Sequence, residues 1–205
     1  MTELTLLDTG SLPEFFRERV STSMQDLRIK ASPQAEFYLV NLLVSFAQTE
    51  KLYERNENGE LVDSALAVLF LEGMSKTASE KIPLLKKTGD IALYVSGFFS
   101  DSFFRKVINI DYYIRMGGSA YSSVSQLVEK DPARHLSELF GELAVNFIPF
   151  MDVISEVADA SGMKSDQNLL KLYEKWLKTG SERTRELLVR EGIIPNETVK
   201  TKFAQ

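Results

Sequence analysis

Signals that start or stop a helix recur along almost the whole chain, and they constrain the fold more than any other feature. Ser11 and Glu14 have the spacing of a capping box, in which each side chain accepts a hydrogen bond from a backbone N–H group of the other residue. Ser32 and Asp131 each precede a proline, which suits the first position of a helix because no N–H donor is needed there. Gly192 is typical of the residue after a helix end. Strand-like alternation is short and scarce, so the sequence predicts an all-α fold.

These signals predict a single-domain bundle of about eight to nine helices. The chain has no internal repeat, linker or low-complexity segment, so residues 1–205 are expected to form one domain, with a tail over 193–205 that frays. The segments 37–47, 61–74 and 91–99 are apolar on most sides, which is typical of central helices covered by the others. The expected helices span residues 12–30, 33–54, 61–80, 82–99, 101–108, 111–129, 132–160, 165–179 and 181–191.

Composition and charge exclude several classes of function. The net charge is −5 and the isoelectric point is near 5.1, so the chain lacks the basic surface that nucleic acid or an anionic membrane requires. Without cysteine there is no disulfide, thiolate nucleophile or iron–sulfur ligand. The longest apolar run, Ala65–Leu71, is too short to cross a bilayer, and the N-terminus lacks the pattern of a signal peptide. We therefore expect a cytoplasmic protein of the bacterial type.

Residues 89–121 stand out because aromatic and glycine residues concentrate there. The segment holds eight aromatic residues and four of the 11 glycines of the chain. A glycine inside a helix costs about 1 kcal/mol relative to alanine, and what it offers in return is space. In one interpretation, the glycines let two helices pack closely and the aromatic rings fill the core. In the other, these helices form the wall of a narrow apolar cavity with a few polar groups at its mouth.

Two motifs in this segment carry a resemblance to known proteins. They are Gly89-Asp90-x-Ala92-Leu93 leading to Gly97-Phe98-Phe99, and Asp111-Tyr112-Tyr113-Ile114-x-Met116-Gly117-x-x-Ala120-Tyr121. Together they resemble a family of small bacterial all-helical proteins of largely unassigned function. The resemblance covers 33 of the 205 residues. It implies an internal tunnel that holds a fatty acid or a similar lipid, and it carries over no individual binding residue.

A lipid site needs polar groups for the carboxylate and apolar side chains for the tail. We expect the head group to be bound by Arg115, Tyr112, Tyr121, Ser119 and His135. Proline removes a backbone donor and clashes with the preceding turn, so Pro149 should bend the helix over 132–160 and open space beside it. The apolar tunnel is expected to be lined by Tyr94, Gly97, Phe98, Phe99, Phe103, Met116, Gly117, Phe140 and Phe147.

Recognised catalytic motifs are missing from the chain. Its single histidine, His135, precedes a glutamate, whereas a di-iron bundle needs Glu-x-x-His on two helices. Phosphate-binding glycine loops and serine nucleophile elbows are absent too.

We therefore expect non-enzymatic binding of a fatty acid or other lipid, without metal or cofactor. The alternative is an interaction or regulatory module whose apolar helices bind a second copy, as a homodimer, or a partner protein. The sequence leaves open whether four acids in apolar surroundings have a chemical role: Glu72, Asp90, Asp111 and Glu142.

Overall fold

Helices form every regular element in the described part of the chain, which comprises residues 12–48, 64–99, 110–128, 134–160 and 169–190 of the computed structural model. The all-α prediction is therefore confirmed. The helix predicted over 101–108 and the tail lie outside the described residues. The nine helices within these ranges are α1 (Leu12–Asp26), α2 (Pro33–Gln48), α3 (Ser64–Ser75), α4 (Ala78–Phe98), α5 (Ile110–Val128), α6 (Arg134–Val145), α7 (Phe147–Ala160), α8 (Leu169–Thr179) and α9 (Glu182–Arg190).

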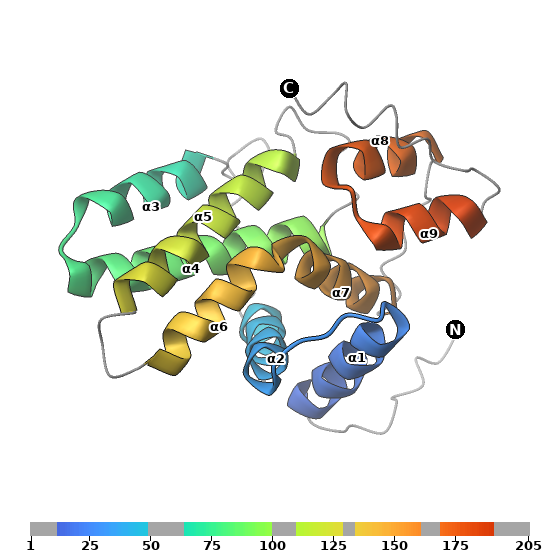
Figure 1. Ribbon diagram of the computed structural model, residues 1–205, viewed down its shortest axis with the longest axis horizontal. Helices are drawn as coiled ribbons and strands as arrows, with labels where there is room; N and C mark the ends of the chain where they lie inside the picture. The colour runs from blue at the N-terminus through green and yellow to red at the C-terminus, as the bar shows by residue number, and fades with distance from the viewer. Residues whose placement is uncertain (1–11, 49–63, 100–109, 129–133, 161–168, 191–205) are drawn as a thin grey trace, which may run out of the picture.

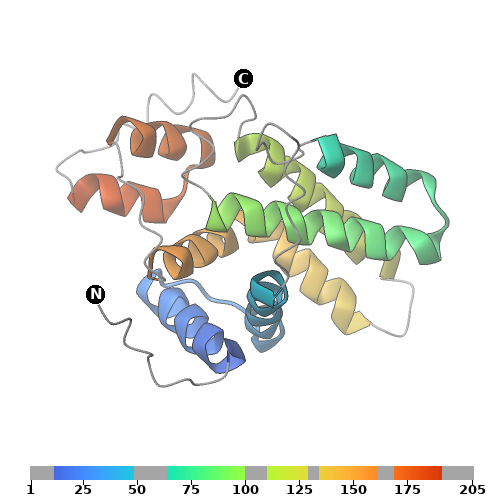
Figure 2. The same ribbon diagram turned by 180° about the vertical axis from the view of Figure 1, so that it is seen from behind.

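The long helix α4 lies at the centre of the bundle (Figure 1). Helices α5 and α7 pack against it, α2 contacts it, and α3 forms a hairpin with it. Helix α6 packs on α5, and α1 packs on α2 and α7. The α8–α9 pair lies at the opposite end of the molecule from α3 in both views (Figures 1 and 2). Contacts to α4 therefore join elements from both halves of the chain.

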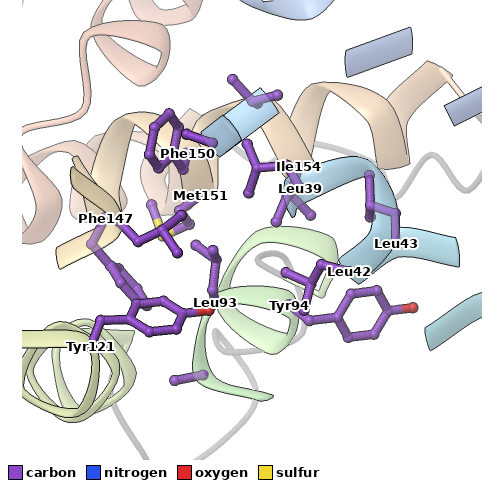
Figure 3. Close-up of a cluster of buried hydrophobic side chains, with 14 of the residues drawn as sticks. Leu39, Leu42, Leu43, Leu93, Tyr94, Tyr121, Phe147, Phe150, Met151 and Ile154 are labelled. Carbon is purple, nitrogen blue, oxygen red and sulfur yellow. The ribbon is translucent and has the colours of Figure 1, made fainter. Parts of the chain in front are cut away.

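Side chains from α2, α4, α5 and α7 meet in the main core (Figure 3). Leu39 of α2, Leu93 of α4 and Ile154 of α7 are each fully buried there. The central position predicted for 91–99 is confirmed, because residues 92–97 are all buried. Helix α2 buries one face in the core but leaves Phe37 61% exposed, so 37–47 is covered on one side only.

Helix α3 differs from the other two helices that are expected at the centre. Although it is apolar on most sides, it lies at the edge of the bundle (Figure 1). One of its faces contacts α4, while Val68, Leu71 and Met74 on another face are 57%, 67% and 46% exposed. The central position predicted for 61–74 is therefore wrong for the described residues, and α3 presents an apolar surface to solvent.

The start of α2 follows the prediction made from Ser32 and its proline. Ser32 Oγ accepts a hydrogen bond from the N–H of Ala35 at 3.1 Å, which is the geometry of an N-cap. Glu142 of α6 completes this cap from the other side: Ser32 N donates to its Oε1 at 2.8 Å, and Ser32 Oγ donates to its Oε2 at 2.5 Å. A carboxylate at a helix N-terminus is also favoured by the helix dipole. Glu142 thus fastens α6 to the beginning of α2.

The helix predicted over 132–160 is divided into α6 and α7 at Asn146. The cause is Pro149, which has no N–H group to donate to the carbonyl oxygen of Val145, four residues earlier. Helical bonding continues beyond the break, because the N–H of Phe150 donates to Asn146 O at 2.9 Å. The bend expected at Pro149 is confirmed, and a single helix over this range is wrong. The break lets α6 pack on α5 while α7 packs on α4 and α1.

Helices α8 and α9 contain a small apolar cluster of their own, made by Leu172, Trp176 and Leu188. Their described links to α7 are polar. Ser181, which precedes α9, donates to Asp152 Oδ2 at 2.6 Å, and the buried Arg183 binds the carboxylates of Glu156 and Asp159. The hairpin is thus held to α7 by charged and hydroxyl groups.

Candidate functional site

The best-supported candidate site is an open pocket between α3 and α5 with a volume of about 440 Å³. Five of its six lining residues come from α5, where they recur at helical spacing and form one face of that helix. The opposite face of α5 is buried in the core. The lining residues are Phe70 from α3 and Asp111, Tyr112, Arg115, Met116 and Ser119 from α5.

The pocket combines apolar walls with two charged groups, the guanidinium of Arg115 and the carboxylate of Asp111. Phe70, Tyr112 and Met116 are partly buried and pack against the main core, so their exposed parts form a fixed apolar surface. The side chain of Arg115 is exposed, and within the described part of the chain its guanidinium forms no ion pair or hydrogen bond. Such an arrangement suits a ligand that has an apolar body and a negative end.

Three of the five residues predicted to bind a head group meet in this pocket: Arg115, Tyr112 and Ser119. The other two do not line it. Tyr121 is fully buried in the core on the opposite face of α5, and His135 is exposed near the start of α6. The spacing of residues along α5 could place the first three together, whereas the position of His135 depended on the packing of another helix.

Most residues predicted to line a tunnel pack against one another instead. Tyr94 stacks on Phe98 with ring centroids 5.1 Å apart and contacts Phe99 edge-on at 5.8 Å. Phe140 and Phe147 pack around Tyr121, at 5.8 Å and 6.2 Å. Met116 alone of the predicted tunnel residues lines the α3–α5 pocket, and Phe103 lies outside the described residues.

The two predicted tunnel glycines lie where helices approach closely. A Cβ atom at Gly97 would come within 2.7 Å of Ile154 Cβ, so α4 and α7 touch there. A Cβ atom at Gly117 would overlap the ring of Phe147 and lie 2.8 Å from Ala92 Cβ. At both positions the glycine provides room for a neighbouring side chain, which is the packing interpretation of residues 89–121.

A partly buried polar cluster around Asp90 was not predicted as a unit from the sequence. Asp90, whose side chain is 13% exposed, accepts hydrogen bonds at Oδ1 from Tyr38 (2.5 Å) and Tyr121 (2.8 Å). Lys86 forms an ion pair with Oδ2 at 2.6 Å and also lies 5.1 Å from the centre of the Tyr38 ring. The spacing of Lys86 and Asp90 is visible in the sequence, but the tyrosines arrive from α2 and α5.

The electrostatics of this cluster favour a structural role. Burial, followed by the negative charge of Asp90, raises the pKa of both Tyr38 and Tyr121 above the usual value for tyrosine. Both phenols therefore remain protonated donors, and they fix Asp90 between α2 and α5. Tyr94 lies outside this cluster, and burial alone raises its pKa to about 12.

The remaining acids with an open role occupy different settings. Glu142 caps α2, Asp111 lines the α3–α5 pocket, and Glu72 forms an exposed ion pair with Lys76 at 3.9 Å.

Among the described residues, no group of three or more histidine, aspartate or glutamate side chains is arranged to hold a metal ion. No helix in the described ranges combines the length and apolar character that a bilayer span needs.

Comparisons with protein-family models, with curated proteins and with solved structures find no match to this chain.

Proposed function

We propose that the protein binds a fatty acid or a similar amphiphilic anion, without catalysis, in the pocket between α3 and α5. The observation that carries the proposal is an exposed Arg115, which forms no ion pair with any described residue, beside the apolar side chains of Phe70 and Met116. A volume of about 440 Å³ falls in the range of small-molecule sites, which is roughly 300–1,000 Å³.

Each part of the ligand has a partner in this pocket. The carboxylate pairs with Arg115, and Ser119 offers a hydroxyl donor one helical turn away. The hydrocarbon chain lies against Phe70 and Met116, where each CH₂ group removed from water contributes about 0.8 kcal/mol. The exposed apolar side chains of α3 could cover a chain longer than the pocket. The proposed site is therefore an open groove rather than a tunnel through the core.

Replacement of Arg115 tests this proposal. Arg115→Ala should weaken the binding of a fluorescent fatty acid by about tenfold or more, because a hydrogen-bonded charge pair is lost. Arg115 is exposed, so thermal unfolding should hardly change. Arg17→Ala removes the same charge from an exposed position on α1 and should leave binding intact.

Native mass spectrometry of protein purified from cells would show whether lipid is bound. An apo mass together with no uptake of fluorescent fatty acid would contradict the proposal, as would equal loss in both variants.

A second candidate function is favoured by the exposed apolar face of α3. Val68, Leu71 and Met74 lie at successive positions of one stripe and are 46–67% exposed. Exposed apolar stripes of this kind often mark protein interfaces. In this alternative, the chain is an interaction module in which α3 packs on a second copy, and the oligomeric state distinguishes it from a monomeric lipid-binding protein.

A further inference from the structure

A second pocket, of about 260 Å³, lies where the α8–α9 hairpin meets α7 and the connection between α1 and α2. It is separate from the α3–α5 pocket and shares no lining residue with it. Its apolar wall consists of Leu27, Ile29, Ile148 and Pro149. The other wall is polar and includes Asp152 and the first residues of α9.

Asp152 is the unusual residue in this pocket. Its side chain is buried, with the residue only 3% exposed, and Oδ2 accepts the hydrogen bond from Ser181. Its Oδ1 has no hydrogen-bond partner, and no other buried side-chain atom of the described residues shares that state. A buried carboxylate oxygen without a donor is costly, so a donor that reached it would be bound favourably.

The charges around the pocket favour a cationic donor. Three lining residues are acids, namely Asp152, Glu182 and Glu186, and one is a base, Arg183, which leaves a formal charge of −2. Arg183 is engaged by Glu156 and Asp159, and Glu182 is paired with Arg185. Burial raises the pKa of Asp152, and the positive charges of Lys175 and Arg183 partly offset that rise. Glu186 is half-buried and forms no ion pair with another described residue. A net negative wall opposite an apolar wall fits a ligand with a positive end and an apolar body.

We propose that this pocket binds a small organic cation, namely a primary ammonium group on a short hydrocarbon body. The ammonium donates to Asp152 Oδ1 and is attracted by Glu186, while the hydrocarbon lies against Leu27, Ile29 and Ile148. An ammonium fits better than a metal ion, because the described residues provide no cluster of three metal ligands. The volume equals about eight or nine water molecules at roughly 30 Å³ each, which suits a body of about six carbons.

The test is a titration followed by the backbone amide signals of the isotopically labelled protein. Hexylammonium should give saturable shifts for residues 179–186, whereas the neutral hexanol and the anionic hexanoate should not move these signals. Asp152→Asn keeps the shape and removes the charge, so it should weaken hexylammonium binding by about tenfold. Glu18→Gln removes one acid from an exposed position on α1 and should leave the affinity unchanged.

A second variant covers the case in which Asp152→Asn does not fold. Glu186→Gln lies at a half-buried position and should weaken binding by about twofold to fivefold, as expected for a partly screened charge. The inference is overturned if hexylammonium produces no saturable shifts at residues 179–186, if hexanol shifts them equally, or if neither pocket variant weakens binding. The fatty-acid proposal is judged separately, because its ligand should affect signals of α3 and α5.

Discussion

At the scale of single residues, the Tyr121 hydroxyl donates to Asp90 from a fully buried position. Tyr121→Phe keeps the ring among its aromatic neighbours but leaves the carboxylate with one donor fewer. We expect the free energy of unfolding in urea to fall by about 1–2 kcal/mol. Tyr173→Phe makes the same change on α8, where the hydroxyl has no described hydrogen bond, and should cost no more than about 0.5 kcal/mol. Equal losses would argue against a stabilising bond to Asp90.

The raised pKa of the Tyr121 hydroxyl leads to a prediction for the stability of the fold at high pH. The pKa of Tyr121 is raised above its usual 10.0 in the folded chain, so the folded state keeps a proton that the unfolded state releases. The stabilisation that follows from this difference in pKa is complete below about pH 10 and is lost as the pH rises further. Urea unfolding from about pH 8 to about pH 11 should therefore show a smaller loss for Tyr121→Phe than for the unchanged chain. If both chains lose the same free energy of unfolding over this pH range, the raised pKa of Tyr121 is contradicted.

At the scale of one helix, the adjacent glycines of α5 should respond in opposite directions to alanine. At Gly117 an added methyl group would overlap the Phe147 ring, so Gly117→Ala should destabilise the fold by about 1–3 kcal/mol. At Gly118 the nearest atom is Ala144 O at 3.9 Å, so Gly118→Ala should stabilise it by up to about 1 kcal/mol through helix propensity. Thermal unfolding of the two variants measures both effects. Stabilisation by Gly117→Ala would mean that α5 does not pack on Phe147 of α7 and Ala92 of α4 as described.

At the scale of the whole molecule, the exposed face of α3 determines whether two copies associate. If this face forms a homodimer, the chain should sediment as a dimer and Leu71→Glu should make it a monomer, because a charge would be buried at the interface. Phe37→Glu is the matched control: Phe37 is 61% exposed on α2, away from this face. A monomer at about 0.1 mM, well above the Kd of a stable dimer, would exclude the α3 interface.

The helical architecture was predictable from the sequence because its signals are local. Ser32 and Pro149 act on backbone groups within four residues, and both had the expected effect. The site was predictable only where one helix carries it, as for Arg115 and Ser119 on α5. The hydropathy of α3 could not reveal whether other helices surround it, and the two tyrosines that bind Asp90 lie 52 and 31 positions away from it in the chain. Such contacts depend on the packing of helices, which local patterns in one sequence do not reveal.

The bond between Ser32 and Glu142 joins residues 110 positions apart, and this separation has a consequence for synthesis on the ribosome. Chains grow at about 5–20 residues per second, so Glu142 is added roughly 6–22 s after Ser32. During that interval the nascent α2 has the Ser32 hydroxyl at its first turn but no carboxylate beside it. The N-terminal helices therefore cannot reach their final anchorage until most of the protein has been translated.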